Sequence, residues 1–148
     1  MKRLTWVVGP PAAGKTTWAE RLRTQSPAPR ILEFAQLLHP LVDPVHPRKG
    51  MMQAKSLFIR AIRQVELHPA NVGLPPLVVI VALIHEEALL PLSEEEELIL
   101  ILPPRAQWER QFLDRSAPPS PGSRPMGLEE ARGWYERYLR WRFPRTTP

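Results

Sequence analysis

The stretch Gly9-Pro10-Pro11-Ala12-Ala13-Gly14-Lys15-Thr16-Thr17 decides how the rest of the chain is interpreted. Its first eight residues fit the pattern G-x-x-x-x-G-K-[ST] at every fixed position, which is the pattern of a loop that wraps around phosphate groups. The residues before it, 3–8, are apolar and β-branched and indicate a buried strand. Residues 16–23, after it, have the apolar spacing of a helix. The order of strand, glycine-rich turn and helix is the setting in which such a loop binds a nucleoside triphosphate.

The backbone of this loop is suited to anions. Gly9 lets the chain turn sharply off the strand, and Gly14 lets the backbone close around phosphate. The N–H groups of residues 12–16 can then point inward as an anion nest. The positive end of the helix that follows adds to the attraction.

The side chains of the motif predict ATP and Mg²⁺ as its ligands. Lys15 would reach the β- and γ-phosphates, the Thr16 hydroxyl would bind Mg²⁺, and Thr17 could bond the α-phosphate. We therefore expect Thr16 to be the metal ligand. The residues expected to bind the nucleotide are Gly9, Pro11, Ala12, Ala13, Gly14, Lys15, Thr16 and Thr17.

Segments of strand and helix character alternate along the remaining sequence. This alternation predicts an α/β fold, a three-layer sandwich with a mostly parallel sheet of four to five strands. We expect a single domain over residues 1–148, with a lid-like segment at 104–126. The further strands are predicted at 30–34, 77–84 and 97–102, the further helices at 51–66, 86–90, 104–115 and 128–143, and loops at 39–50, 69–76 and 117–126.

Composition narrows the possible classes of function. The chain has no cysteine, which excludes disulfides, thiolate metal sites and a cysteine nucleophile. No apolar run approaches the roughly 20 residues that span a bilayer, and the apolar start leads into the loop motif rather than a cleavage site, so we expect a cytoplasmic protein without a membrane partner. The net charge is +5, but many arginines and 19 prolines also occur in GC-rich genomes and hot habitats. The charge therefore says little about a nucleic-acid partner.

The loop and its continuation Thr17-Trp18-Ala19 resemble the loop and first helix of phage-type polynucleotide 5′-hydroxyl kinases. More broadly they are similar to the P-loop kinase group, which includes adenylate kinases and zeta-toxin-like kinases, and to small ATP-binding P-loop proteins of phages. The far end of the chain resembles the lid and last helix of these kinases through Pro103, Pro104, Trp108, Arg110, Arg115 and residues 135–138. The resemblance implies transfer of the ATP γ-phosphate to a polynucleotide 5′-hydroxyl or to a nucleotide.

Within this resemblance, Arg110 and Arg115 match the lid arginines that cover the charge of the transferring phosphate. They could equally be solvated charges on an amphipathic helix. A P-loop kinase also places an acid at the end of a buried strand, yet residues 77–84 contain none, and the first polar side chains after them are His85, Glu86 and Glu87.

Glu33 is the one acid near the second predicted strand. It is our candidate for the general base or a ligand of the magnesium shell, with Glu86 or Glu87 assisting. Alternatively, the protein is a catalytically weak ATP-binding or ATPase module that assists a nucleic-acid process. An oligomeric motor ATPase is disfavoured, because the chain is short and lacks the strand-end acid.

Other polar clusters have simpler interpretations. We predict that residues 94–97, four consecutive glutamates, form a solvated turn. The last helix interleaves arginines with aromatic residues, a combination that can hold single-stranded nucleic acid, but its apolar spacing favours packing of the aromatics on the core. The histidines lack metal-ligand spacing, so no structural metal is expected.

Overall fold

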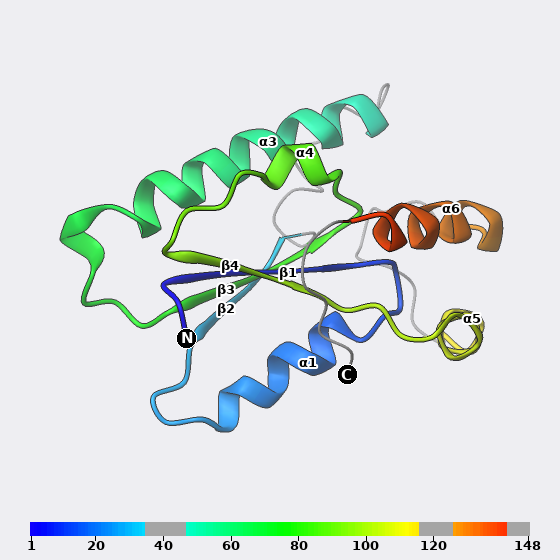
Figure 1. Ribbon diagram of the computed structural model, residues 1–148, viewed down its shortest axis with the longest axis horizontal. Coiled ribbons are helices and arrows are strands. Elements are labelled where there is room, and N and C mark those ends of the chain that lie inside the picture. Colours follow the sequence, from blue (N-terminus) through cyan, green and yellow to red (C-terminus); the bar gives the residue numbers. More distant parts are fainter. Residues whose placement is uncertain (35–46, 116–125, 142–148) are drawn as a thin grey trace.

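The computed structural model describes residues 1–34, 47–115 and 126–141, with only the backbone described for 47–51. Four strands and the helices around them make up this part of the chain (Figure 1). The strands are β1 (Leu4–Gly9), β2 (Arg30–Glu33), β3 (Leu77–Ala82) and β4 (Glu96–Leu100). The α-helices are α1 (Lys15–Glu20), α3 (Pro47–Glu66), α4 (Glu86–Leu89), α5 (Arg105–Leu113) and α6 (Leu128–Leu139), and the 3-10 helices are η1 (Arg21–Thr24) and η3 (Pro69–Asn71).

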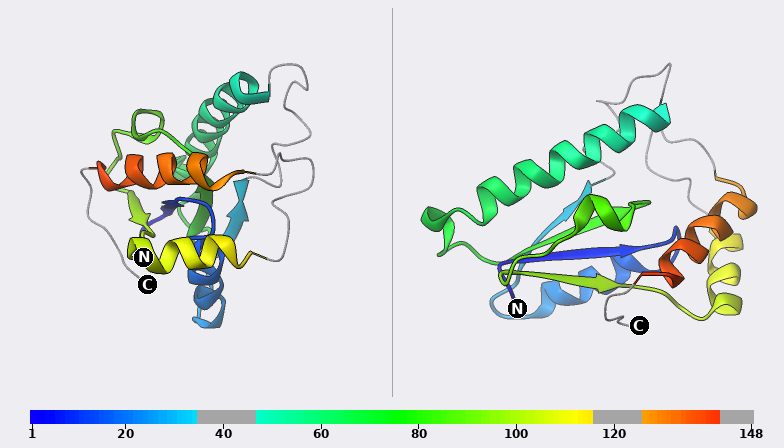
Figure 2. Two further views of the ribbon diagram at one scale, coloured as in Figure 1. Left: turned by 90° about the vertical axis from the view of Figure 1, so that its right-hand side faces the viewer. Right: turned by 45° about the horizontal axis from the view of Figure 1, so that its top comes forward.

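The strands form one sheet in the order β2-β3-β1-β4, and every neighbouring pair is parallel. Helix α1 lies on one side of the sheet and α3 and α4 lie on the other, while α5 and α6 lie near the carboxyl ends of the strands (Figures 1 and 2). The predicted three-layer α/β sandwich is therefore confirmed, with four strands and a fully parallel sheet.

The strand order has a switch point between β1 and β3. From β1 the chain continues to β2 in one direction along the sheet, and from β3 it continues to β4 in the opposite direction. The direction of the connections therefore reverses between these two adjacent strands. In open parallel sheets, ligands bind outside the carboxyl ends of the strands at such a switch point. Each residue of β1 is buried, as expected for a strand covered on both faces.

Helix α3 begins earlier than the sequence suggested. Residues 47–50 were expected to belong to a loop, but they form the first turn of α3, whose first residue is Pro47. Proline is well tolerated there, because the first turn of a helix needs no intrahelical N–H donor. The other residues of that predicted loop, 39–46, lie outside the described part of the chain, as do 117–125 of the third predicted loop and 142–143 of the last predicted helix.

The predicted solvated turn at residues 94–97 is wrong for Glu96, which lies in β4 and is only 4% exposed. Its carboxylate accepts hydrogen bonds from the indole N–H of Trp6 at 2.8 Å, from Nε of Arg63 at 2.8 Å and from the Ser93 amide at 3.0 Å. Burial raises the pKa of Glu96, but these hydrogen bonds and the Arg63 charge outweigh it and leave the pKa below its ordinary value. A buried carboxylate is therefore part of the core.

Two aromatic residues of α6 and one just after it pack inward, as predicted for this part of the chain. Tyr135, Tyr138 and Trp141 are 4%, 0% and 5% exposed. The ring of Trp108 from α5 lies 4.7 Å from that of Tyr135, so α5 and α6 share one aromatic core.

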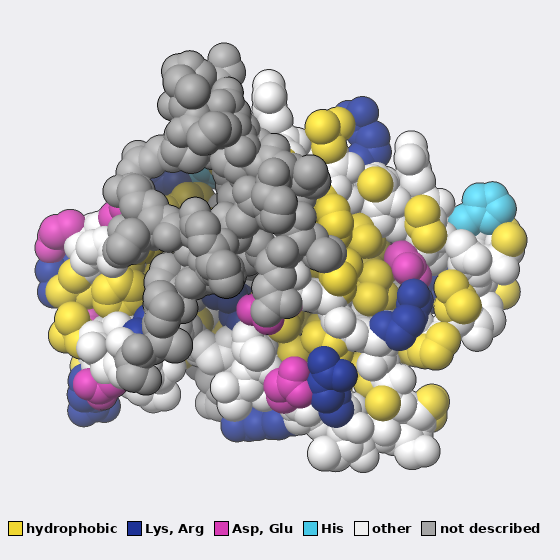
Figure 3. All heavy atoms as spheres, turned by 180° about the vertical axis from the view of Figure 1, so that it is seen from behind, with side chains coloured by type: hydrophobic (Ala, Val, Ile, Leu, Met, Phe, Trp, Pro, Cys, Tyr) yellow, Lys and Arg dark blue, Asp and Glu magenta, His cyan; other side chains and the backbone are white. Residues whose placement is uncertain are grey.

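On the face drawn in Figure 3, acidic and basic side chains lie close together among apolar ones.

Candidate phosphate-binding site

The loop from Gly9 to Gly14 has the backbone conformation that its glycines were expected to permit. A Cβ atom on Gly9 would lie 2.4 Å from the carbonyl oxygen of Ile101, so only glycine fits at this close approach. Gly14, which precedes α1, has φ +96°, and Ala12 has φ +61°. Such positive φ values bend the chain so that successive amides can face one concavity.

Helix α5 holds the outside of this loop. The Trp108 indole donates to the carbonyl of Pro11 at 2.7 Å, and the Gln111 side-chain amide donates to the carbonyl of Ala12 at 2.9 Å. In a trans peptide the carbonyl and the next N–H point in opposite directions. The N–H groups of Ala12 and Ala13 therefore point away from α5, as an anion nest requires.

Lys15 lies inside the loop and is 8% exposed. Its Nζ donates to the carbonyl of Gly9 at 2.9 Å and to that of Pro10 at 2.7 Å. The pKa of Lys15 is lowered to about 7, mainly by burial and also by the charges of Arg115 and Lys55, while the charge of Glu33 opposes them. An anion in the loop would restore the protonated form, so the side chain is suited to bind phosphate.

Thr16 and Glu33 meet at the carboxyl edge of the sheet. The Thr16 hydroxyl donates to Oε1 of Glu33 at 3.3 Å. Glu33 is the last residue of β2 and is half-buried, and its register partner on β3 is Ile80. The structure thus brings the expected metal ligand and the expected acid together, beside Lys15.

Sequence reasoning missed Lys55, which α3 contributes to the same edge. It is 7% exposed, and its Nζ donates to the carbonyls of Ala82 and Leu83 at 2.7 Å each. Burial lowers its pKa to about 8. Its signal in the sequence was a lone lysine within the apolar stripe of α3, close to Ile59 on the same helix.

The two arginines expected in the lid lie on the outside of the molecule. Arg115 follows α5, is exposed, and lies with its guanidinium 5.8 Å from the centre of the Phe112 ring. Its charge is still felt at Lys15. Arg110 is exposed on α5, and within the described residues its side chain makes no hydrogen bond or ion pair with the loop.

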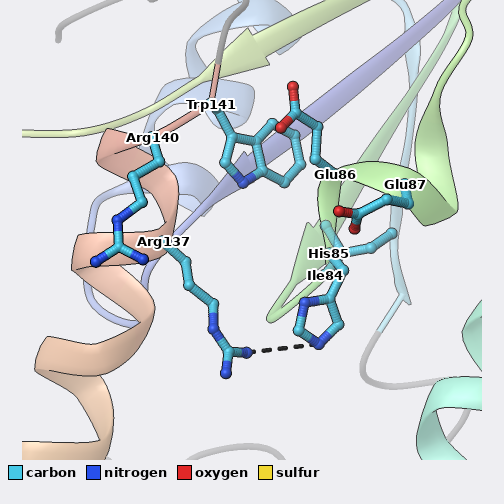
Figure 4. A pocket seen from close by; sticks show the side chains of 7 residues that line it. All are labelled: Ile84, His85, Glu86, Glu87, Arg137, Arg140 and Trp141. Atoms are coloured by element: carbon cyan, nitrogen blue, oxygen red, sulfur yellow. Dashed lines mark hydrogen bonds between the residues drawn. The ribbon is translucent and has the colours of Figure 1, made fainter.

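Glu86 and Glu87 line a different pocket, between α4 and the end of α6 (Figure 4). This pocket has a volume of about 250 Å³, and Nη1 of Arg137 lies 3.4 Å from Nε2 of His85 across it. The structure therefore places Glu33, rather than these two acids, in contact with Thr16. The residues that line the pocket are Ile84, His85, Glu86, Glu87, Arg137, Arg140 and Trp141.

The residues at the loop fit a magnesium ion with few protein ligands. Among residues 1–34, 47–115 and 126–141, no three His, Asp or Glu side chains gather as metal ligands. The hydroxyl of Thr16 and the carboxylate of Glu33 are adjacent oxygen donors. Mg²⁺ is commonly held by one or two protein oxygens together with substrate phosphates and water, so this pair suffices.

A buried hydroxyl connects α6 to the base of the site. The Ile84 amide donates to the Tyr138 hydroxyl at 3.1 Å. Burial raises the pKa of this phenol, and hydrogen bonds with the backbone of Ile84, Leu83 and Gly9 partly offset the rise. Tyr138 therefore ties the last helix to the ends of both β1 and β3.

Comparison with known proteins supports the fold. The chain is similar to an unliganded sugar kinase from Janibacter sp. HTCC2649, with a TM-score of 0.65 and 11% identity over 100% of this chain and 84% of that chain. TT1252 from Thermus thermophilus is also similar, with a TM-score of 0.46 and 16% identity over 91% of this chain and 79% of that one. No protein-family model and no curated protein matches the chain.

No helix within the described residues is long and apolar enough to cross a membrane.

The predicted membership of the phage-type polynucleotide kinases stays a prediction. The parallel sheet with helices on both faces and the likeness to the sugar kinase together show that the chain has a kinase-like P-loop NTPase fold.

Proposed function

We propose that this protein binds ATP with Mg²⁺ and transfers the terminal phosphoryl group to an acceptor hydroxyl. The observation that carries the proposal is the convergence of Lys15 with the Thr16–Glu33 pair at the switch point of the sheet. A phosphate-binding lysine, a hydroxyl ligand and a carboxylate are the groups that phosphoryl transfer needs in one place.

The loop would position the phosphates. The amides of Ala12 and Ala13, directed away from α5, and the start of α1 present donors to phosphate oxygens. Lys15 would exchange its bonds to the carbonyls of Gly9 and Pro10 for bonds to the β- and γ-phosphates. Bonds from an ammonium group to phosphate oxygens join opposite charges, so they are stronger than the ammonium–carbonyl bonds they replace.

Glu33 would act beside the reacting group. Its place at the end of β2 lets the carboxylate accept the proton of an acceptor hydroxyl or orient the magnesium shell. Thr16 and Glu33 would hold the ion, which would supply positive charge to neutralise the phosphates. Arg115, whose charge already reaches Lys15, would cover the transferring phosphoryl group.

The acceptor is a polynucleotide 5′-hydroxyl or a nucleotide in our proposal, and the likeness to a sugar kinase adds sugars to the test panel. The experiment is transfer from γ-labelled ATP to 5′-hydroxyl DNA, 5′-hydroxyl RNA, nucleoside monophosphates and hexoses. We expect label on one class, and none with Lys15→Met. ATP binding without transfer to any acceptor would reject the kinase and leave the binding function.

A second candidate is an ATP-binding module with little turnover. One observation favours it: β3 ends at Ala82 and is followed by Leu83 and Ile84, so no acid stands at the end of the strand beside β1. Calorimetry with ATP, with and without Mg²⁺, separates the candidates. Tight binding that barely changes with Mg²⁺, together with negligible turnover, supports the module, whereas turnover that depends on Lys15 contradicts it.

A further inference from the structure

Lys55 is a buried cation whose only described partners are uncharged. The residue is 7% exposed, and its ammonium group donates to the carbonyls of Ala82 and Leu83. Within the described residues no carboxylate forms an ion pair with it. A buried charge is costly unless it is paired or binds a ligand, so this arrangement calls for an anion.

The register of the sheet places Lys55 next to Lys15. Gly9 and Ala82 are paired residues on the adjacent strands β1 and β3. Lys15 bonds to the carbonyl of Gly9, and Lys55 bonds to the carbonyl of Ala82. Neighbouring strands lie about 4.8 Å apart, so the two ammonium groups bind carbonyls of neighbouring residues. The charge of Lys55 lowers the pKa of Lys15, so the two like charges repel each other, and an anion between them would relieve the repulsion.

Lys55 also lies on the Glu33 side of the loop. Along the carboxyl edge of the sheet the order is Glu33 at the end of β2, Lys55 at the end of β3 and Lys15 at the end of β1. Because Lys15 is expected to reach the β- and γ-phosphates, the terminal group of a bound triphosphate would lie near Lys15 and its neighbour Lys55. An ammonium group has three donors, and two of them bond to carbonyls, which leaves one for a ligand.

The backbone after β3 is shaped around this lysine. Leu83 has φ +57°, a left-handed conformation that is unfavourable for a residue with a Cβ. In this conformation its carbonyl, like that of Ala82, bonds to Lys55. The strained peptide thus fixes the ammonium group at one point of the strand edge.

We propose that Lys55 binds the terminal phosphoryl group of the triphosphate, as a second phosphate-binding lysine from α3 beside Lys15. The proposal rests on the ATP binding proposed above, and it gives the end of β3 a cation where an acid was expected. It predicts that Lys55 distinguishes ATP from ADP.

The test compares ATP and ADP binding by calorimetry in wild type, Lys55→Met and Arg60→Met. Arg60 is an exposed residue of α3, so its substitution removes one positive charge from the same helix without touching the site. We expect Lys55→Met to weaken ATP binding roughly ten- to a hundredfold and ADP binding less than about threefold. Arg60→Met should change neither.

The outcomes separate this proposal from the proposed function. Equal loss of ATP and ADP affinity, or no loss, in Lys55→Met overturns the role of Lys55 and leaves ATP binding intact. A wild-type protein that binds both nucleotides but transfers no phosphate would reject the kinase while the ATP-to-ADP comparison still decides on Lys55. A wild-type protein that binds neither nucleotide overturns both.

A measurement on the wild type covers the case in which Lys55→Met does not fold. The side-chain resonance of Lys55, assigned with Lys55→Arg, is titrated by NMR with and without saturating ATP. A phosphoryl group in contact raises the pKa of Lys55 from about 8, and ADP raises it less. A pKa unchanged by ATP overturns the proposal.

Discussion

The hydroxyl of Thr16 donates a hydrogen bond of 3.3 Å to Glu33, which joins the first helix to the end of an edge strand. The two residues are 17 positions apart in sequence and belong to different layers of the fold. This contact makes Glu33 the first residue to test.

Glu33→Gln keeps the size of the side chain and removes its charge. We expect kcat to fall about a hundredfold or more, as for loss of a general base, while KM for ATP changes less than about threefold. Steady-state kinetics with the accepted acceptor measure both. Glu33→Asp should recover part of kcat, and a variant with unchanged kcat would show that Glu33 is only a structural partner of Thr16.

Lys15→Met should separate binding from stability. Loss of the ammonium group removes the main cation of the loop, so we expect ATP affinity to fall about a hundredfold or more. In the free protein the same charge is buried without a carboxylate contact, and its removal should raise the unfolding free energy by about 1 kcal/mol. Urea unfolding and calorimetry test the two effects, with the exposed Lys2→Met as control. A lower unfolding free energy would contradict this account.

The stability of the free protein should rise with pH above neutrality. Lys15 and Lys55 have pKa values of about 7 and about 8 when folded, and an unfolded lysine has about 10.4. Between about pH 7 and 10 the unfolded state therefore binds more protons, and the unfolding free energy increases with pH by an amount on the order of several kcal/mol. Urea titrations across this range measure the slope, which should be shallower in Lys15→Met.

ATP binding near pH 8 should take up protons. Phosphate favours the charged form of both lysines, so their pKa values rise on binding. Calorimetry in buffers of different ionisation enthalpy gives the number of protons taken up. A value of zero at this pH would show that neither ammonium group contacts the ligand.

Gly9→Ala should damage the loop. The added Cβ would lie 2.4 Å from the carbonyl oxygen of Ile101, and backbone on both sides must then move. We expect a loss of about 2–3 kcal/mol in unfolding free energy together with weaker ATP binding. Gly73→Ala is the matched control, because no atom lies within 4 Å of its Cβ position. Equal stability of the two variants would rule out the close approach.

Glu96→Gln tests the buried carboxylate of the core. The pKa of Glu96 is below its ordinary value, so its charge stabilises the fold above the unfolded pKa of about 4.3 and this contribution is lost as pH falls through the folded value. We expect the variant to lose about 1–3 kcal/mol of unfolding free energy at neutral pH, and its stability should change less than that of the wild type when the pH is lowered. Thermal melts at neutral and acidic pH, with the exposed Glu94→Gln for comparison, measure both.

The sequence could predict the loop because its chemistry is local. Gly14 and Lys15 lie in one short segment, and the strand and helix around them show clear apolar patterns. The parallel sheet followed from the same patterns repeated along the chain. The proximity of Thr16 and Glu33 could also be predicted, because the strands of a parallel sheet have their carboxyl ends at one edge.

Lys55 and Glu96 could not be assigned in this way, because their surroundings come from distant segments. Lys55 bonds to carbonyls 27 and 28 residues away, and Glu96 bonds to Trp6, 90 residues away. From sequence alone a charged residue is expected to be solvated, and its burial becomes evident only when the packing of α3 on the sheet is known. Arg110 shows the reverse case, since its place in a lid-like motif does not bring it to the loop within the described residues.

The orientation of the amides in the anion nest depends on α5, because Trp108 and Gln111 donate hydrogen bonds to the carbonyls of Pro11 and Ala12. A peptide with residues 1–24 contains the complete motif, yet nothing in it turns those two peptide planes. By thermodynamic linkage, a ligand that prefers the turned planes must also favour the docking of α5. Bound nucleotide would thus stabilise the contact between the loop and α5. Protection of α5 amides from hydrogen exchange would then report an occupied loop almost a hundred residues away in sequence.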